Sequence, residues 1–259
     1  MTFTGVLLDL DDTLLVEEKS AETSFLEVAL AVSDQWKIDP REFVPVIREC
    51  ARSLWYSLPT FPYAKQMGIA SWEALWADFS EINEDQKRLR GLKEYYQNTA
   101  WDNAMKHFNI NDFRFAKDLA QKFRKIRRNK HVLFSDTIPF LTRILPYKLA
   151  LVTNGSPDVQ RIKLEKSGLA KYFSTITISA EIGYAKPTRE IFEITLSQLK
   201  MRSDEVIMIG NSLKSDVRGA KVSNIFSVWV NREGVANTSR VEPDLEVSNL
   251  LKILDILEL

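Results

Sequence analysis

Residues 5–13 read Gly-Val-Leu-Leu-Asp-Leu-Asp-Asp-Thr, a short apolar run that ends in three acidic residues and a threonine. The apolar run is typical of a buried β-strand, and the change to acidic residues marks its carboxyl end. Asp9 and Asp11 are two positions apart, so an extended chain places both side chains on the same side. Two such carboxylates can bind a divalent cation or act as nucleophile and general acid–base. In isolation, the segment also fits an acidic turn that caps a helix.

Further apolar runs occur after about residue 133, at 149–152, 174–179, 206–209 and 225–230. Helical stretches separate them, and this alternation predicts βα units and a parallel sheet. The runs are apolar on both faces, as expected for strands that helices cover on each side. We therefore expect an α/β fold whose parallel-sheet core is formed by residues 1–15 and 133–259.

The stretch from residue 16 to residue 132 has a helical hydrophobic pattern throughout. Asp39, which a proline follows, is an expected N-cap of a long helix. Ser71 and Asn83 are further expected caps, and the segment 58–70 is expected to be a loop because it contains two prolines and a glycine. We expect residues 16–132 to form a second, all-helical domain inserted into the core.

The composition excludes several classes of protein. The 259 residues include 35 Lys and Arg against 35 Asp and Glu, a balance that argues against a nucleic-acid binder. The single cysteine, Cys50, excludes a disulfide framework and a cysteine-based zinc cluster. No apolar run is long enough to cross a bilayer, and residues 1–4 lack the charged segment that opens a signal peptide. We expect a cytoplasmic protein whose partners include no nucleic acid and no membrane.

Several common catalytic motifs are absent as well. The nine glycines form no Gly-x-Gly pair, no phosphate-binding P-loop and no Gly-x-Ser-x-Gly elbow. His107 and His131 lie in or beside the helical stretch, where we expect surface histidines, and Cys50 is expected to be a packed thiol in a helix. Carboxylates are therefore the expected catalytic groups.

Three more polar segments follow the expected strands. Thr153-Asn154-Gly155 offers a hydroxyl and amides that suit phosphate oxygens. Lys186-Pro187 precedes a helix expected to begin near Thr188, where a lysine is favourable if an anion lies beside it. Segment 210–216, Gly-Asn-Ser-Leu-Lys-Ser-Asp, carries oxygen ligands that suit a hard cation. Each segment alone also fits a turn, a solvated lysine or a helix cap.

Together the four segments resemble the motifs of the haloacid dehalogenase-like (HAD) hydrolase superfamily. Asp9-x-Asp11-x-Thr13 is similar to the first motif, Thr153-Asn154 to the second, Lys186-Pro187 to the third, and segment 210–216 to the fourth. The resemblance implies a Rossmann-like parallel-sheet core with a helical cap domain inserted after the first motif. It places the chain in the phosphatase branch of the superfamily.

This resemblance implies a phosphatase that hydrolyses a small phosphorylated metabolite through an aspartyl-phosphate intermediate. Asp9 would be the nucleophile, and Asp11 would be the general acid–base. Lys186 would offset negative charge beside Asp9. Thr153, Asn154 and Lys186 would bind the phosphate of the substrate.

The resemblance also implies a Mg²⁺ site formed by Asp9, Asp11, Asn211 and Asp216, with Asp11 contributing its backbone carbonyl. Family phosphatases usually have Gly-Asp where this chain has Gly210-Asn211. An amide oxygen can ligate Mg²⁺ but supplies no negative charge. We therefore expect weaker metal binding than with aspartate, with Asp216 as the supporting carboxylate.

Other activities remain open at this point. A phosphomutase shares the aspartyl phosphate but returns the phosphoryl group to a sugar, and Asn211 also fits a non-catalytic metabolite-binding or regulatory protein. Dehalogenation is disfavoured, because the family's dehalogenases lack the acid–base aspartate that Asp11 would supply. The expected oligomeric state is a monomer or a homodimer.

Overall fold

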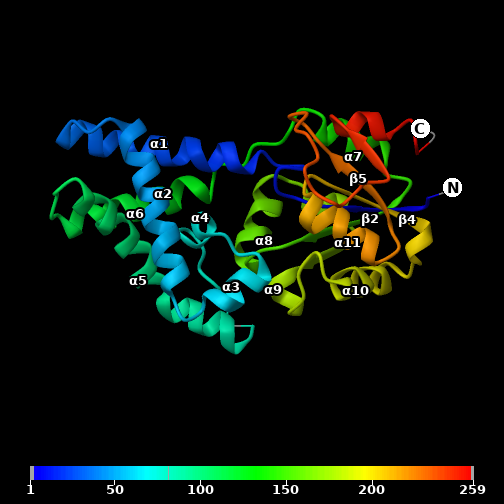
Figure 1. The fold of residues 1–259 in the computed structure, drawn as a ribbon, viewed down its shortest axis with the longest axis horizontal. Helices are drawn as coiled ribbons and strands as arrows, with labels where there is room; N and C mark the ends of the chain where they lie inside the picture. The colour runs from blue at the N-terminus through cyan, green and yellow to red at the C-terminus, as the bar shows by residue number, and fades with distance from the viewer. Residues whose placement is uncertain (1–2, 81, 258–259) are drawn as a thin grey trace. The chain divides into compact units, whose positions relative to one another are not determined.

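The computed structural model describes residues 3–80 and 82–257 of the chain. The described residues fold into two compact units (Figure 1). One unit contains a β-sheet and is formed by the chain up to Val16, by Val132–Asn154 and by the chain from Ser167 onward. The other unit is helical and is formed by Glu17–His131 and Gly155–Lys166.

Six parallel strands form the sheet, in the spatial order β3-β2-β1-β4-β5-β6. The strands are β1 (Gly5–Leu8), β2 (Lys148–Thr153), β3 (Thr175–Ile178), β4 (Val206–Gly210), β5 (Phe226–Val230) and β6 (Leu245–Val247). The first five lie on the apolar runs of the sequence, whereas the three-residue β6 was not predicted. Because β2, β1 and β4 are neighbours, the polar segments that follow them meet at the carboxyl edge of the sheet.

The helices of the sheet unit cover the apolar strands. They are α7 (Thr137–Arg143), α9 (Ser179–Ile182), α10 (Arg189–Leu199) and α11 (Arg218–Val222). Phe192 of α10 belongs to one buried cluster with Leu7 of β1 and Met208 of β4. In Figure 1 the sheet lies between α10 on one side and α7 on the other. The prediction of an α/β fold with a Rossmann-like parallel sheet is confirmed.

Aromatic side chains pack against one another inside the helical unit. Its helices are α1 (Glu17–Trp36), α2 (Pro40–Ser57), α3 (Phe61–Met67), α4 (Ser71–Ala74), α5 (Glu84–His107), α6 (Phe113–Arg127) and α8 (Pro157–Lys166). Phe25 of α1 and Phe123 of α6 stack with their ring centroids 4.4 Å apart, and Trp101 of α5 lies 5.6 Å from Phe123. Large buried aromatics of this kind supply much of the apolar area that holds helices together. None of the helices within the described ranges combines the length and the apolar character needed to cross a bilayer.

Of the three predicted helix caps, two are confirmed and one is wrong. Asp39 and Asn83 cap α2 and α5, and their side chains accept hydrogen bonds from backbone N–H groups 2.8 and 2.9 Å away. Ser71 was predicted as a cap, but it is the first residue of α4. Ala70 takes the extended backbone of the cap position, and Glu73 reaches back to its N–H.

The segment 58–70 is not a loop throughout, because it contains α3. The prolines and the glycine on which the loop prediction rested are compatible with a short helix. Pro62 lies in the first turn, where the N–H that proline lacks would have no helical partner. Gly68 ends the helix in the left-handed conformation, with φ of 72°.

Helix α8 belongs to the helical unit, although the sequence interpretation assigns all of residues 133–259 to the α/β core. Lys163 of α8 is fully buried, and its Nζ lies 2.6 Å from Glu73 Oε1 and 3.4 Å from Glu17 Oε1. Asp158, also on α8, accepts a hydrogen bond of 2.6 Å from the backbone N–H of Asp78. These polar contacts group α8 with the helices, and hydrophobic periodicity does not reveal them.

Candidate active site

A buried lysine joins two carboxylates at the carboxyl edge of the sheet. Lys186 Nζ lies 2.6 Å from Asp9 Oδ1, directly after β1, and 2.8 Å from Asp216 Oδ1, after β4. It also donates to the carbonyl oxygen of Val152, 2.6 Å away. The side chains of Asp9, Lys186 and Asp216 expose at most 9% of their surface. Two carboxylates and one ammonium leave this trio with an excess negative charge.

The buried trio shifts two pKa values. Burial raises the pKa of Asp9, the charge of Lys186 lowers it and the charge of Asp216 raises it, with a net increase above the ordinary value. Burial would lower the pKa of Lys186, but Asp216 and Asp9 outweigh it, so this pKa is raised. The lysine therefore stays cationic. The Asp9 carboxylate would be further stabilised as an anion by additional positive charge beside it.

Thr13 connects the first polar segment with the fourth. Its hydroxyl donates to Asp9 Oδ2 at 2.8 Å and accepts a hydrogen bond of 3.0 Å from the backbone N–H of Asn211. The side-chain oxygen of Asn211 is 3.4 Å from the same hydroxyl. Trp229 of β5 donates from Nε1 to the carbonyl oxygen of Asn211 at 2.9 Å. These contacts fix the orientation of Asp9 and hold Asn211 beside it, through the shared Thr13 hydroxyl.

Asp216 is held in a tight turn after β4. Its Oδ2 accepts a hydrogen bond of 2.9 Å from the backbone N–H of Ser212. A Cβ atom on Gly210 would lie only 2.3 Å from that Oδ2. Glycine is therefore required at the end of β4, because the Asp216 carboxylate occupies the space of a side chain.

The second and third segments are joined through Asn154. Its Nδ2 donates to the carbonyl oxygen of Lys186, and its Oδ1 accepts from the backbone N–H of Lys186, both at 2.9 Å. The side chain of Asn154 thus positions the backbone of the buried lysine, and its predicted contact with phosphate stays a prediction. Thr153, the preceding residue, is buried at the end of β2.

Asp11 lies in the turn that directly follows Asp9. The turn is sharp: Asp12 has a φ of 56°, and its N–H donates to the carbonyl oxygen of Leu15 at 2.7 Å. Asp11 is half-buried there. The structure thus places Asp9 and Asp11 in one turn at the sheet edge, and the acid–base role of Asp11 stays a prediction.

Arg232 and Asp136 support this turn and were not predicted. Arg232 donates to both carboxylate oxygens of Asp136, at 2.9 and 3.1 Å, and to the carbonyl oxygen of Thr13 at 2.8 Å. Its guanidinium also lies 3.8 Å from the ring centroid of Phe134. The two residues are 96 positions apart, and no sequence motif links them. The one sequence signal for Arg232 is its place just after the apolar run 225–230.

The histidines and the cysteine lie outside the sheet unit. His107 is exposed, as expected, whereas His131 is half-buried with its ring 6.3 Å from that of Trp76. Burial lowers the pKa of His131, and the nearby Arg127 lowers it further. Burial raises the pKa of the half-buried Cys50 thiol, as expected for a packed and unreactive cysteine.

The oxygen atoms at the sheet edge fit a hard divalent cation. Asp9 and Asp216 supply carboxylate oxygens, and Asn211 supplies an amide oxygen close to Thr13. Mg²⁺ prefers ligands of this kind, and the excess negative charge of the trio favours a cation beside it. The donor set therefore fits the expected metal.

The chain is similar to hydrolases of one family. Residues 6–230 match the family described as haloacid dehalogenase-like hydrolase. A phosphoserine phosphatase from Thermus thermophilus is 32% identical over 252 residues, which cover 96% of each chain. Among solved structures, HAD-hydrolase YfnB from Bacillus subtilis, bound to magnesium, matches with a TM-score of 0.69 at 21% identity over all of both chains. A 2-haloacid dehalogenase from Pseudomonas syringae matches with a TM-score of 0.62 at 20% identity, over 99% of each chain.

The two solved structures show a shared fold, and the sequence match spans most of the chain. This chain therefore belongs to the haloacid dehalogenase-like hydrolase family.

Proposed function

We propose that this hydrolase is a Mg²⁺-dependent phosphatase that acts on a small phosphorylated metabolite through a phosphorylated Asp9. The observation that carries the proposal is the buried cluster of Asp9, Lys186 and Asp216, with Asp11 in the same turn as Asp9. The Thermus thermophilus relative, 32% identical over 96% of the chain, is a phosphoserine phosphatase, which makes phosphoserine the first substrate to test.

The proposed reaction has two steps. A carboxylate oxygen of Asp9 attacks phosphorus, an O–P bond forms, and the ester P–O bond breaks while Asp11 protonates the leaving oxygen. Asp11, now ionised, takes a proton from the water that attacks the phosphoryl group. The Asp9–phosphate bond breaks, inorganic phosphate leaves, and the Asp9 carboxylate is restored.

The surrounding residues hold the reacting atoms and balance their charge. Thr13 keeps Asp9 in one orientation through its 2.8 Å hydrogen bond. Lys186 offsets the negative charge that gathers between Asp9 and the phosphoryl oxygens. Thr153, Lys186 and Asn154 form the proposed phosphate site, with Asn154 also holding the Lys186 backbone.

The metal ligands in this proposal are Asp9, Asn211, Asp216 and the backbone carbonyl of Asp11. When bound, Mg²⁺ supplies electrostatic stabilisation of the phosphoryl oxygens. Because Asn211 contributes no charge, we expect Asn211→Asp to bind Mg²⁺ several-fold more tightly in a calorimetric titration. Equal Mg²⁺ affinity in the two proteins would contradict this role for Asn211.

Asp11 favours a phosphatase over a dehalogenase. An alkoxide is a poor leaving group unless it is protonated, whereas a halide leaves without a proton. A half-buried carboxylic acid two residues from Asp9 therefore serves phosphate ester hydrolysis and has no use in dehalogenation. Chloride release from a 2-haloacid, without phosphatase activity, would overturn the proposal.

The test is hydrolysis of p-nitrophenyl phosphate and phosphoserine by the wild type and by Asp9→Asn, with Mg²⁺ and with EDTA. We expect release of inorganic phosphate that needs Mg²⁺ and that Asp9→Asn abolishes. Asp11→Asn, under the same conditions, is expected to accumulate the phosphoryl group on Asp9, which mass spectrometry of the digested protein detects. Turnover that Asp9→Asn leaves intact would refute the mechanism.

Two further measurements complete the proposal. A phosphomutase would convert a sugar phosphate while releasing little inorganic phosphate, so analysis of both products separates it from a phosphatase.

We also propose that the protein is cytoplasmic and is a monomer or a homodimer. Cell fractionation would check its location, and light scattering on the purified chain would check its oligomeric state.

A further inference from the structure

The helical unit contains a cavity of about 680 Å³ between α3 and the first turns of α5. A volume of this size is typical of a site for a small molecule. Its walls include Pro59, Pro62 and Leu92, which offer apolar surface, and Tyr63 and Gln66, which offer polar groups. These residues lie in the helical unit, whereas the proposed catalytic residues lie in the sheet unit.

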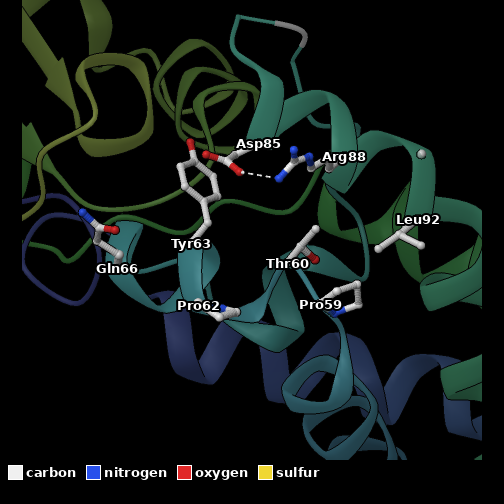
Figure 2. A pocket seen from close by; sticks show the side chains of 9 residues that line it. Pro59, Thr60, Pro62, Tyr63, Gln66, Asp85, Arg88 and Leu92 are labelled. Carbon is white, nitrogen blue, oxygen red and sulfur yellow. Dashed lines mark ion pairs between the residues drawn. The ribbon is translucent and has the colours of Figure 1, made fainter.

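One wall of the cavity carries a pair of opposite charges. Asp85 and Arg88 are one turn apart on α5, with Asp85 Oδ1 3.7 Å from Arg88 Nη1. Figure 2 shows this pair on one side of the cavity and the two prolines on the other. The side chains of Asp85 and Arg88 are 48% and 72% exposed, and such a long, solvated pair contributes little by itself. Both charges are therefore accessible to a ligand.

Tyr63 adds an oriented hydroxyl to the cavity. Its oxygen accepts hydrogen bonds from Gln86 Nε2 at 3.2 Å and from Asn83 Nδ2 at 3.4 Å. The amide of Asn83 is fixed in this orientation because its Oδ1 accepts the backbone N–H of Gln86 at 2.9 Å. A phenol has one hydrogen to donate, and none of the hydrogen bonds found within the described part of the chain has the Tyr63 hydroxyl as its donor. It is therefore available to an acceptor on a ligand.

The charges select between classes of ligand. A phosphate would meet Asp85 beside Arg88, and a simple cation would meet Arg88 beside Asp85, so each would face one like charge. A zwitterion satisfies both. We propose that this cavity binds a free α-amino acid with an apolar side chain, with its carboxylate on Arg88 and the Tyr63 hydroxyl, its ammonium on Asp85, and its side chain against Pro59, Pro62 and Leu92.

Gly91 gives a clean way to close this cavity. It lies on α5 in the wall, and a Cβ atom built on it meets no other atom within 4 Å. Gly91→Phe would therefore place a ring in the cavity without a clash at the backbone. Gly91→Ala is the matched control, since it leaves the cavity open and favours the helix.

The experiment is calorimetric titration of the full-length protein with L-leucine. We expect saturable binding in the wild type, in Gly91→Ala and in Asp9→Asn, and none in Gly91→Phe. Removing one charged hydrogen bond costs about 1.4 kcal/mol or more, so Arg88→Gln and Asp85→Asn should each weaken binding at least about tenfold. Circular dichroism checks that each variant is folded.

The ligand side of the test does not depend on any variant. N-acetyl-L-leucine lacks the ammonium and L-leucinamide lacks the carboxylate, so both are expected to bind at least about tenfold more weakly than L-leucine. Absence of L-leucine binding to the wild type would overturn the proposal. It would also be overturned if the three compounds bound with equal affinity, or if inorganic phosphate bound as tightly as L-leucine. Loss of binding in Asp9→Asn would place the ligand at the sheet site and also refute it. Because binding is measured without turnover, failure of the phosphatase proposal leaves this test unaffected.

Discussion

Two lysines of this chain are buried between pairs of carboxylates, one in each unit. In the sheet unit, Lys186 lies 2.6 Å from Asp9 and 2.8 Å from Asp216. In the helical unit, Lys163 lies 2.6 Å from Glu73 and 3.4 Å from Glu17. All of these side chains are buried. The two lysine clusters are therefore alike in geometry and burial.

They differ in their charge balance. Arg127 is fully buried and also pairs with Glu17, so the ion pairs described within the helical unit join two positive and two negative side chains. The sheet cluster has one positive side chain against two negative ones. Burial raises the pKa of Glu17, but Lys163 and Arg127 outweigh this effect and hold it below its ordinary value, whereas the pKa of Asp9 is raised. We therefore expect the helical cluster to act chiefly on stability, and the sheet cluster to favour a further cation.

The largest expected effect is a loss of stability when the lysine of the helical cluster is replaced. Lys163→Met should lower the free energy of unfolding by about 3–5 kcal/mol, because it removes the buried ammonium that lies 2.6 Å from the buried Glu73 carboxylate. Urea unfolding followed by circular dichroism measures this. Adding Glu73→Gln removes the buried carboxylate charge and should recover part of the loss.

An exposed ion pair provides the control for that measurement. Arg189 and Glu193 of α10 pair at 2.8 Å with more than half of each side chain exposed. Arg189→Met should therefore change the free energy of unfolding by less than about 1 kcal/mol. A loss from Lys163→Met no larger than this would show that the helical cluster contributes nothing to stability.

Lys186→Met should lower catalysis as well as stability, because it takes the cation from the buried Asp9 and Asp216 carboxylates. Without its ammonium, turnover of p-nitrophenyl phosphate should fall by about 10²–10³-fold, the usual cost of removing one preorganised electrostatic contact. The variant leaves Asp9 and Asp216 with no buried cation, so Mg²⁺ should stabilise it against urea more than it stabilises Lys163→Met. Equal stabilisation of the two variants by Mg²⁺ would remove the distinction between the clusters.

Gly210→Ala tests whether the position of Asp216 matters. The added Cβ would lie 2.3 Å from Asp216 Oδ2, so the carboxylate must move away from its present place beside Lys186. We expect a loss of turnover of about tenfold, together with weaker Mg²⁺ binding in a calorimetric titration. Gly183→Ala is the control, since Gly183 has a positive φ of 80° but no atom within 4 Å of an added Cβ, and it should lower stability without weakening Mg²⁺ binding.

The sheet cluster could be predicted from the sequence, because its parts follow strands. Apolar runs mark the strands, and the carboxyl ends of neighbouring parallel strands meet, so Asp9, Lys186 and the segment 210–216 were expected at one site. The resemblance to a known family supplied their order. Local pattern and fold topology located these segments, and the resemblance joined them into one expected site.

The helical cluster could not be predicted in the same way. Lys163 lies in a polar helix and looks like a solvated lysine, yet it is buried by pairing with Glu73, 90 positions away. Arg232 and Asp136 were missed for the same reason, since they meet only after folding. Pairing between distant charged residues leaves no periodic signal, and for that reason α8 was assigned to the core.

The smallest expected effect is a difference in pH dependence. A folded-state pKa of Glu17 below its ordinary value of 4.5 contributes stability that is present above about pH 4.5 and is lost as the pH falls through the folded-state pKa. Glu17→Gln should therefore be less stable than the wild type at pH 7, and the difference should shrink below pH 4.5. Urea unfolding in EDTA at a series of pH values measures it.

In the same pH series, the change in stability that comes from the sheet cluster should have the opposite sign. Because the pKa of Asp9 is raised above 3.8, ionised Asp9 opposes folding, and the wild type should gain stability relative to Asp9→Asn as the pH falls through the folded-state pKa. Asp9→Asn also leaves Lys186 and Asp216 as a balanced pair, so at pH 7 it should be no less stable than the wild type. If Glu17→Gln and Asp9→Asn shifted stability in the same direction at pH 7, charge balance would not distinguish the two clusters.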